Sequence, residues 1–125
     1  MPKLNQERRR HLRVEGNIPL KICTDDFDLV SEASNLSRTG AYCRVNQYVE
    51  PMTKLKIQLL LPFKRHEKVV TKKVACGGVV VRIEALPDSE GFHVAIYFND
   101  IQERCAEIIS EYINTTLESK TKTEA

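Results

Sequence analysis

The feature that most constrains the fold is an alternation of apolar and polar side chains with a period of two. Ile18, Leu20 and Ile22 stand two positions apart, and a strand points successive side chains to opposite faces, so residues 18–23 are predicted to form a half-buried strand. The chain has 125 residues, enough for one domain with one core. We expect further strands at residues 27–33, 41–45, 54–61, 69–83 and 92–98.

Polar or glycine-containing segments separate the predicted strands. Residues 24–26 form a turn, residues 35–40 lead into a turn or bulge, and residues 62–68 form a charged loop. Gly77 and Gly78 interrupt the longest strand, where a glycine pair indicates a bend or bulge. Because no helices alternate with the strands, the pattern favours an antiparallel arrangement over a βαβ sheet.

One amphipathic helix is expected near the C-terminus. Asp100 is placed to cap it, and its apolar stripe ends near residue 117. Six strands and one packing helix predict a mainly β fold, a small six-stranded antiparallel β-barrel, since closure removes the exposed sheet edges. The stripe consists of Ile101, Cys105, Ile108, Ile109, Tyr112 and Ile113.

Three regions follow from these patterns: a flexible arginine-rich arm (residues 1–16), the barrel with its helix (17–117) and a disordered tail (118–125). The arm holds five Lys or Arg residues and two Glu, whereas the remainder holds 14 basic and 15 acidic residues. Positive charge is therefore expected in the arm, with no basic stripe beyond it.

Several functions are disfavoured by what the sequence lacks. There is no apolar leader or run long enough to span a bilayer, so a cytoplasmic protein without membrane insertion is expected. The four cysteines include no C-x-x-C pair and are expected to be reduced thiols, and no metal site or cofactor is expected. No nucleophile and base stand at a recognisable spacing, so the chain is not expected to be an enzyme.

The arm carries Arg8, Arg9, Arg10 and Arg13 and no lysine among them. A guanidinium group binds a phosphate or the O6/N7 edge of guanine with two parallel hydrogen bonds, and it stacks on purine faces. Four arginines in six residues therefore indicate that the arm binds an anionic nucleotide through paired guanidinium hydrogen bonds. A solvated basic arm is also consistent with this segment.

The second candidate element lies in the segment Asn35-Leu36-Ser37-Arg38-Thr39-Gly40. On an extended backbone Asn35 and Ser37 share one face, where an amide and a hydroxyl can contact base edges or ribose. Gly40 allows either a turn at positive φ or the close approach of a ligand to the backbone. An ordinary polar turn is the alternative interpretation.

Taken together, Arg9-x-x-x-Arg13 and Asn35-x-Ser37-x-x-Gly40 resemble the two motifs of the PilZ domain family, and the resemblance extends over nearly the whole chain. It implies a receptor for the bacterial second messenger cyclic di-GMP. Arg9 and Arg13 would grip phosphate and a guanine edge, and the second motif would contact the other guanine and the sugar–phosphate ring.

The resemblance also assigns roles to the remaining arginines and to the arm. Arg8 would stack on or hold a second copy of the ligand, and Arg10 completes the set. The arm would close over the ligand and thereby present a different surface to a protein effector. A monomer or weak homodimer is expected.

Two alternatives remain at this stage. One is an adaptor with the same fold that binds proteins and no nucleotide. The other is a barrel that binds single-stranded nucleic acid, but that class needs exposed aromatic platforms, and this chain has no Trp, four Phe and four Tyr. A nucleic acid polymer is therefore not the expected partner.

Overall fold

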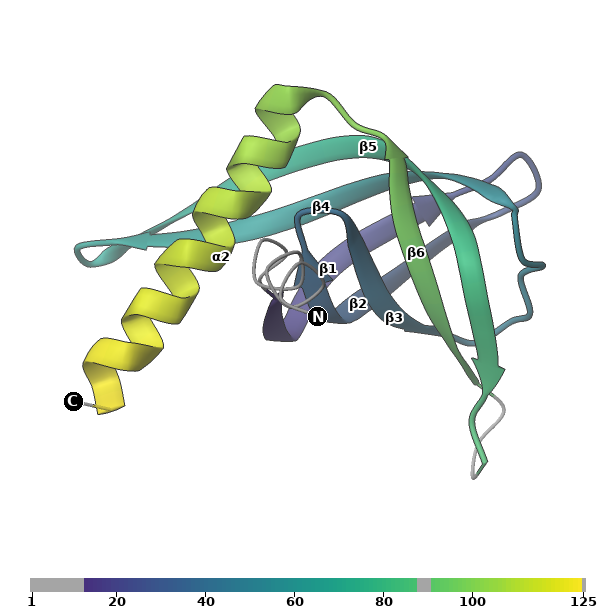
Figure 1. Cartoon of the computed structure of the whole chain (residues 1–125), viewed down its shortest axis with the longest axis horizontal. Helices are drawn as coiled ribbons and strands as arrows, with labels where there is room; N and C mark the ends of the chain where they lie inside the picture. The colour runs from purple at the N-terminus through teal and green to yellow at the C-terminus, as the bar shows by residue number, and fades with distance from the viewer. Residues whose placement is uncertain (1–12, 88–90, 125) are drawn as a thin grey trace, which may run out of the picture.

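A computed structural model describes residues 13–87 and 91–124 of the chain. It contains six antiparallel strands followed by a long C-terminal helix (Figure 1). The elements are β1 (Arg13–Cys23), β2 (Asp28–Ser37), β3 (Gly40–Val45), β4 (Lys54–Arg65), β5 (Lys68–Ala85), β6 (Phe92–Asp100) and α2 (Glu103–Glu124).

The six strands close into a barrel in the order β1-β2-β3-β6-β5-β4. The closing contact joins β1 to β4, with Leu20 opposite Leu59 and Cys23 opposite Lys56. Beyond this contact β4 and β5 continue as a two-stranded hairpin that projects from the barrel beside α2 (Figure 1). The predicted mainly β fold with an antiparallel barrel and a C-terminal helix is confirmed.

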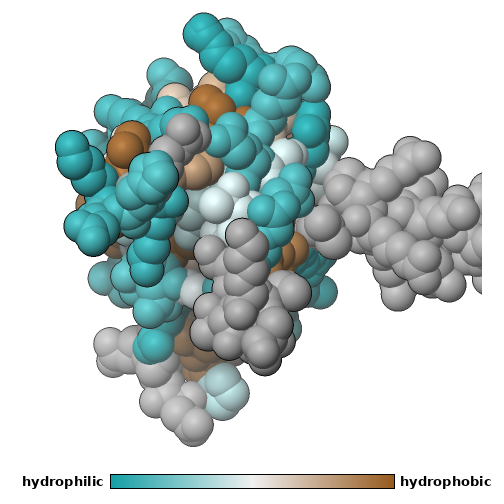
Figure 2. Space-filling view, turned by 90° about the vertical axis from the view of Figure 1, so that its left-hand side faces the viewer, coloured by the Kyte–Doolittle hydropathy of each residue, from teal (hydrophilic) through white to brown (hydrophobic). Residues whose placement is uncertain are grey.

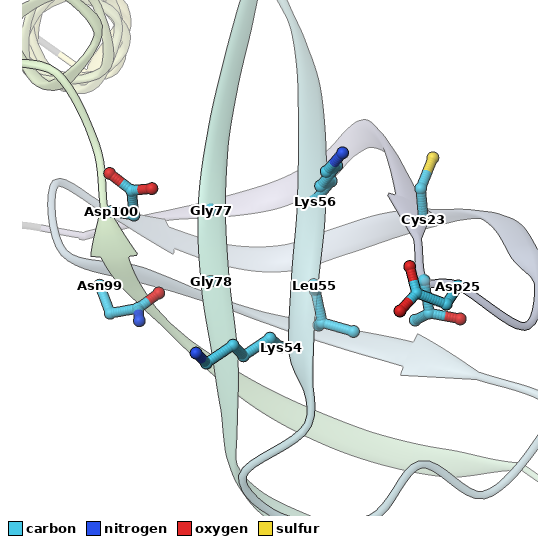
Figure 3. A pocket seen from close by; sticks show the side chains of 10 residues that line it. Cys23, Asp25, Lys54, Leu55, Lys56, Gly77, Gly78, Asn99 and Asp100 are labelled. Atoms are coloured by element: carbon cyan, nitrogen blue, oxygen red, sulfur yellow. The ribbon is translucent and has the colours of Figure 1, made fainter.

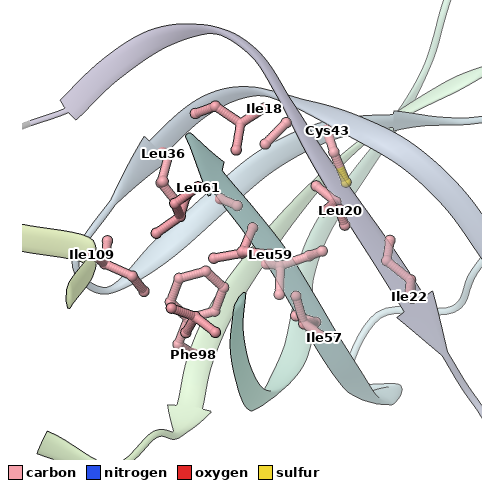
Figure 4. Packing of buried hydrophobic residues seen from close by; sticks show 14 of the residues in the cluster. Ile18, Leu20, Ile22, Leu36, Cys43, Ile57, Leu59, Leu61, Phe98 and Ile109 are labelled. Carbon is pink, nitrogen blue, oxygen red and sulfur yellow. The ribbon is translucent and has the colours of Figure 1, made fainter. Parts of the chain in front are cut away.

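The core fills the barrel and continues beneath the helix (Figure 4). Leu59 and Leu61 of β4 are fully buried and lie in one cluster with side chains of β1 and β2. Ile109 of α2, also fully buried, contributes to the same cluster, and Tyr112 packs edge-on against Phe63 with ring centroids 5.6 Å apart. α2 therefore extends the barrel core over the base of the hairpin.

Two strand boundaries differ from the sequence-based prediction. Residues 13–16, expected in the arm, belong to β1, because Val14 is buried opposite Leu36 and a bulge after Glu15 hides the alternation. The prediction of a charged loop at residues 62–68 is also wrong, because β4 continues to Arg65.

Pro62 explains how β4 continues through the expected loop. It lies opposite Thr71 of β5, in the hairpin segment beyond the four residue pairs that join β4 to β1. A proline is tolerated at such an edge because no second partner needs its missing N–H. Phe63 is buried and therefore continues the inward alternation of the strand.

The helix also differs at both ends. Asp100 is the last residue of β6, opposite Gly77, and does not cap the helix, which begins at Glu103. The disordered tail expected from residue 118 is contradicted, because helical backbone continues to Glu124. Extending an established helix adds one backbone hydrogen bond per residue and needs no apolar anchor.

The expectation that positive charge is confined to the arm is wrong. Between Lys54 and Lys73, strands β4 and β5 carry seven Lys or Arg residues, and the single acid of this segment, Glu67, lies in the turn between them. The near-neutral total outside the arm arises because acidic residues dominate elsewhere. Hydrophilic side chains cover most of the end of the molecule seen in Figure 2, with small apolar patches between them.

Candidate functional site

The turn between β2 and β3 brings the second sequence motif next to the start of β1. Arg13 lies opposite Ser37 in the β1–β2 register, and Ser37 lies opposite Gly40 in the β2–β3 register. Because the side chains of Val14 and Leu36 point into the core, those of Arg13, Ser37 and Asn35 point to the opposite, outward side of their strands. The strand register thus gathers both motifs at one place.

A groove of about 510 Å³ lies at this place. Its size is within the range of small-molecule sites in proteins. Four predicted residues, Arg13, Asn35, Ser37 and Gly40, line it, so the structure brings these four together. Arg8, Arg9 and Arg10 lie outside the described residues. The rest of the lining consists of Thr39, Ala41, Tyr42, Val81, Arg82, Ala95, Ile96 and Tyr97.

Ser37 holds the turn together as well as facing the groove. Its side chain is buried, and its Oγ accepts a hydrogen bond from the Thr39 N–H at 3.2 Å. The same oxygen lies 3.3 Å from the Thr39 hydroxyl and 3.4 Å from the Gly40 carbonyl oxygen. The hydroxyl therefore stabilises a tight turn whose two central residues are Arg38 and Thr39.

The structure shows why position 40 requires a glycine, which the sequence alone does not reveal. It lies opposite Tyr97 of β6, and a Cβ atom built on it would come within 2.3 Å of the Ile96 carbonyl oxygen. Real Cβ contacts are never this short, so only glycine fits. Among the described glycines only Gly16 has positive φ, so a turn at positive φ is not the explanation for Gly40.

Sequence reasoning missed a polar cluster on the groove wall formed by Tyr42, Arg82 and Glu84. The Tyr42 hydroxyl donates a hydrogen bond to Glu84 Oε1 at 3.3 Å, and Arg82 Nε lies 3.4 Å from the same oxygen. Burial and then the negative charge of Glu84 raise the pKa of Tyr42. Its hydroxyl therefore remains protonated at neutral pH, and Arg82 adds a guanidinium that does not come from the arm.

Tyr97 is the other missed residue on the wall. It is 50% exposed and lies opposite Gly40, on the β6 side of the groove. Its exposed ring offers an aromatic face beside the motif residues. Tyr97 alternates with buried Ile96 and Phe98, so the period of two could have identified its outward direction, but not its neighbour across the sheet.

Arg38, inside the second motif, points to the helix instead of the groove. Its Nη2 donates to Glu103 Oε1 at 2.8 Å, and its Nη1 donates to Ser110 Oγ at 3.1 Å. The turn that carries Ser37 and Gly40 is therefore tied directly to the first turns of α2.

The comparison with known families agrees with this arrangement. The sequence matches the PilZ domain over residues 7–115, a match that includes the motif residues both inside and outside the described part. The chain belongs to the PilZ domain family. No curated protein matches the sequence.

Two solved structures resemble this PilZ domain in fold. One is the inhibitor of motility MotI/DgrA of Bacillus subtilis, with a TM-score of 0.77 and 19% identity. The match covers 90% of this chain and 53% of MotI, so the chain spans about half of that protein. The other is the PilZ domain of YcgR from Escherichia coli with c-di-GMP, with a TM-score of 0.64, 12% identity, and coverage of 94% and 98%.

A second hollow of about 450 Å³ lies elsewhere on this PilZ domain (Figure 3). Lys54 and Lys56 of β4, Asp25, Asp100 and the Gly77–Gly78 pair line it. It mixes lysines with carboxylates and contains no arginine or aromatic side chain. It therefore offers neither the guanidinium groups nor the aromatic ring that line the groove at Ser37.

Other reactive groups offer no competing centre. Burial raises the pKa of the Cys43 and Cys76 thiols to about 12, so both remain protonated and unreactive at neutral pH. All four cysteines are free. In the part of the chain that the structure describes, no cluster of His, Cys, Asp or Glu could hold a metal ion, and no helix is long and apolar enough to cross a membrane.

Proposed function

We propose that this chain is a cytoplasmic receptor for cyclic di-GMP that closes its N-terminal arm over the ligand and signals to a protein partner. The family supports this proposal, because PilZ domains are receptor or adaptor domains and not enzymes. The chain uses no cofactor in this role, and cyclic di-GMP is its ligand.

The observation that carries the proposal is the convergence of both motifs on one groove. Arg13 from β1 lies across from Ser37, and Asn35 and Gly40 line the same groove of about 510 Å³. These residues come from separate strands, and only the folded barrel brings them together.

The chemistry of the groove suits a cyclic purine dinucleotide. The guanidinium groups of Arg13 and of Arg9 in the arm can each donate two parallel hydrogen bonds to a phosphate or to the guanine edge. Asn35 offers both a donor and an acceptor to the second base. Arg8 and Arg10 add charge beside them, and Arg8 is the candidate for holding a second copy of the ligand.

The expected affinity follows from two opposing effects. Fixing the arm costs about 1–2 kcal/mol per residue, and each charge-assisted hydrogen bond returns about 1.5–3 kcal/mol. Several such bonds leave a net affinity near 1 μM, about −8 kcal/mol. Binding also relieves the mutual repulsion of the clustered arginines.

A second candidate function is supported by one observation. The Ser37 hydroxyl already bonds within its own turn, and Gly40 is required by the adjacent β6 backbone. Both motif residues would therefore be needed for folding even without a nucleotide. An adaptor that uses this barrel to bind proteins, independently of cyclic di-GMP, is the alternative.

Isothermal titration calorimetry with cyclic di-GMP, GTP and single-stranded RNA separates these functions. We expect selective micromolar binding of cyclic di-GMP, and a loss of about 5- to 150-fold for Arg9→Ala and for Arg13→Ala. Ser37→Ala also weakens binding. Arg104→Ala, on the exposed side of α2, is the matched control and binds as wild type does.

Two results would overturn the receptor proposal. Absence of binding to every nucleotide by the folded wild-type protein favours the adaptor. Equal affinity for RNA and cyclic di-GMP favours a single-stranded nucleic-acid barrel.

A further inference from the structure

The outer face of the β4–β5 hairpin carries a second charged surface, none of whose residues lines the groove. Inward residues of β4 such as Leu59 and Leu61 are buried, so the residues between them point outward. We call this outer surface the lysine face. Its members are Lys54, Lys56, Gln58, Leu60, Pro62 and Lys64 of β4 and Val69, Thr71, Lys73 and Ala75 of β5.

The charge of the lysine face is unbalanced. Its four lysines are exposed, and none forms an ion pair with any carboxylate of the described residues. None of its outward positions is acidic. The adjacent outward position of β1, opposite Gln58, is another lysine, Lys21, whose contact with Asp28 is long at 3.9 Å. Lys54 and Lys56 share a hollow with Asp25 and Asp100 at one end of the face, so the positive potential is least balanced towards Lys64 and Lys73.

Exposed aliphatic side chains lie among the lysines of the face. Leu60 is 42% exposed and lies opposite Lys73, Val69 is 58% exposed and lies opposite Lys64, and Pro62 and Thr71 form the pair between them. Exposed apolar side chains beside charged ones are found at protein–protein contact surfaces. At about 3.3 Å per residue the face is about 33 Å long, which is enough for a small, transient interface.

Three other occupants fit the lysine face less well. A nucleic acid is disfavoured because none of the face residues is an arginine or an aromatic residue that could fork to phosphate or stack on a base. A lipid bilayer is disfavoured because the hairpin tip is the polar pair His66 and Glu67, and the exposed aliphatic side chains lie along the strands instead.

A second copy of the chain is also a poor occupant. Among the elements, α2 carries the largest group of acidic residues, and two of them are already paired, Glu103 with Arg38 and Glu111 with Lys72. Self-association through this face of α2 would have to give up these ion pairs.

We propose that the lysine face docks an acidic amphipathic segment of a partner protein, with carboxylates on the lysines and an aliphatic stripe on Leu60 and Val69. This contact is independent of the nucleotide groove, since no residue of the face lines that groove. The ion pairs between the partner's carboxylates and the lysines remain exposed to solvent. Binding is therefore weak at high salt, and association is fast at low salt.

A synthetic helical peptide with glutamates flanking a leucine stripe serves as the probe, and a scrambled peptide of equal composition tests whether the stripe matters. Both are titrated into the full ¹⁵N-labelled chain at about 50 mM and about 500 mM salt. We expect the amide shifts to be concentrated at Leu60, Val69, Thr71 and Ala75. The scrambled peptide is expected to bind at least tenfold more weakly than the probe, and the probe itself at least tenfold more weakly at the higher salt.

Charge reversal supplies the decisive comparison. The triple variant Lys56→Glu, Lys64→Glu, Lys73→Glu is expected to bind the peptide at least tenfold more weakly. The control variant Arg104→Glu, Lys120→Glu, Lys122→Glu has the same net charge, with its changes on α2, and is expected to bind within twofold of wild type. Thermal unfolding of both variants checks that they are folded.

Four results would overturn the proposal: equal loss in both variants, equal binding of the scrambled peptide, tighter binding to phosphatidylglycerol vesicles than to the peptide, or concentration-dependent dimers at low salt that the face variant abolishes. Because cyclic di-GMP is absent from these titrations, their failure leaves the receptor proposal standing.

Discussion

At the scale of single residues, the second motif both stabilises the fold and lines the groove, and the sequence alone cannot separate these two roles. Ser37 closes the β2–β3 turn through the Thr39 N–H, and Gly40 permits the close approach of the β6 backbone. Both also line the groove. A loss of ligand binding after mutation of either residue is therefore informative only if the folded state is measured too.

The clearest residue-scale prediction concerns Gly40. Gly40→Ala places a methyl group against the immovable Ile96 carbonyl oxygen, so we expect it to lower the free energy of unfolding by about 2 kcal/mol or more. Gly77→Ala is the matched control: its methyl group would meet the Asp100 Cβ at 3.1 Å, which requires a shift of only a few tenths of an ångström, and the cost should stay below about 1 kcal/mol. Urea unfolding measures both, and equal costs would contradict the packing described for Gly40.

A pH dependence follows from the buried thiol of Cys43. Burial raises its pKa from 9.0 to about 12, so above pH 9 the unfolded chain loses a proton that the folded chain retains. Stability is therefore full below pH 9 and falls as pH rises towards 12, by up to about 1.4 kcal/mol per pH unit. Urea unfolding at pH 8 to 11 should show a shallower fall in Cys43→Ala than in wild type, and parallel curves would refute the assignment.

At the scale of elements, the period of two located every strand but not every strand end. Gly16 sits in β1 with φ +156° beside a register shift, and this irregularity concealed the strand residues before it. The charge of residues 62–68 predicts a loop, yet the hairpin extends beyond β1 and leaves an edge at which Pro62 is tolerated. The bend expected at Gly77–Gly78 is confirmed as a register shift.

The groove could be predicted only as far as its motifs extend. Arg13, Asn35, Ser37 and Gly40 were identified by residue type and spacing, and the structure brings them together. Arg82 could not be identified, because Val79 and Val80 are both buried and a second register shift follows Val80. Pairings between distant strands depend on such shifts, which a local pattern does not contain.

An element-scale prediction concerns the tie between the β2–β3 turn and α2. Arg38→Ala removes the contacts to Glu103 and Ser110, so we expect faster hydrogen exchange in the first turns of α2. The free energy of unfolding should fall by only about 1 kcal/mol, because Glu103 is exposed to solvent and its ion pair is screened. Lys72→Ala, which breaks the ion pair to Glu111, is the control and should not affect those first turns. Unchanged exchange in Arg38→Ala would show that the turn and the helix are not coupled.

At the scale of the whole molecule, the barrel carries two charged surfaces that share no residue. The groove draws on β1, β2, β3, β5 and β6, whereas the lysine face lies on β4 and the adjoining half of β5. On β5 the lysine face uses residues 69–75, and the groove uses Val81 and Arg82 further along the strand. A single small domain can therefore hold a nucleotide at one place and a protein at another.

A titration of the full ¹⁵N-labelled chain with cyclic di-GMP, monitored by amide chemical shifts, tests the ligand site itself. We predict saturable shifts at micromolar concentrations for residues 35–42 and for Ala95 and Tyr97, and no comparable response to GTP. Shifts confined to the hollow at Gly77 and Asp100, or no saturable shift at all, would contradict the assignment of the ligand site.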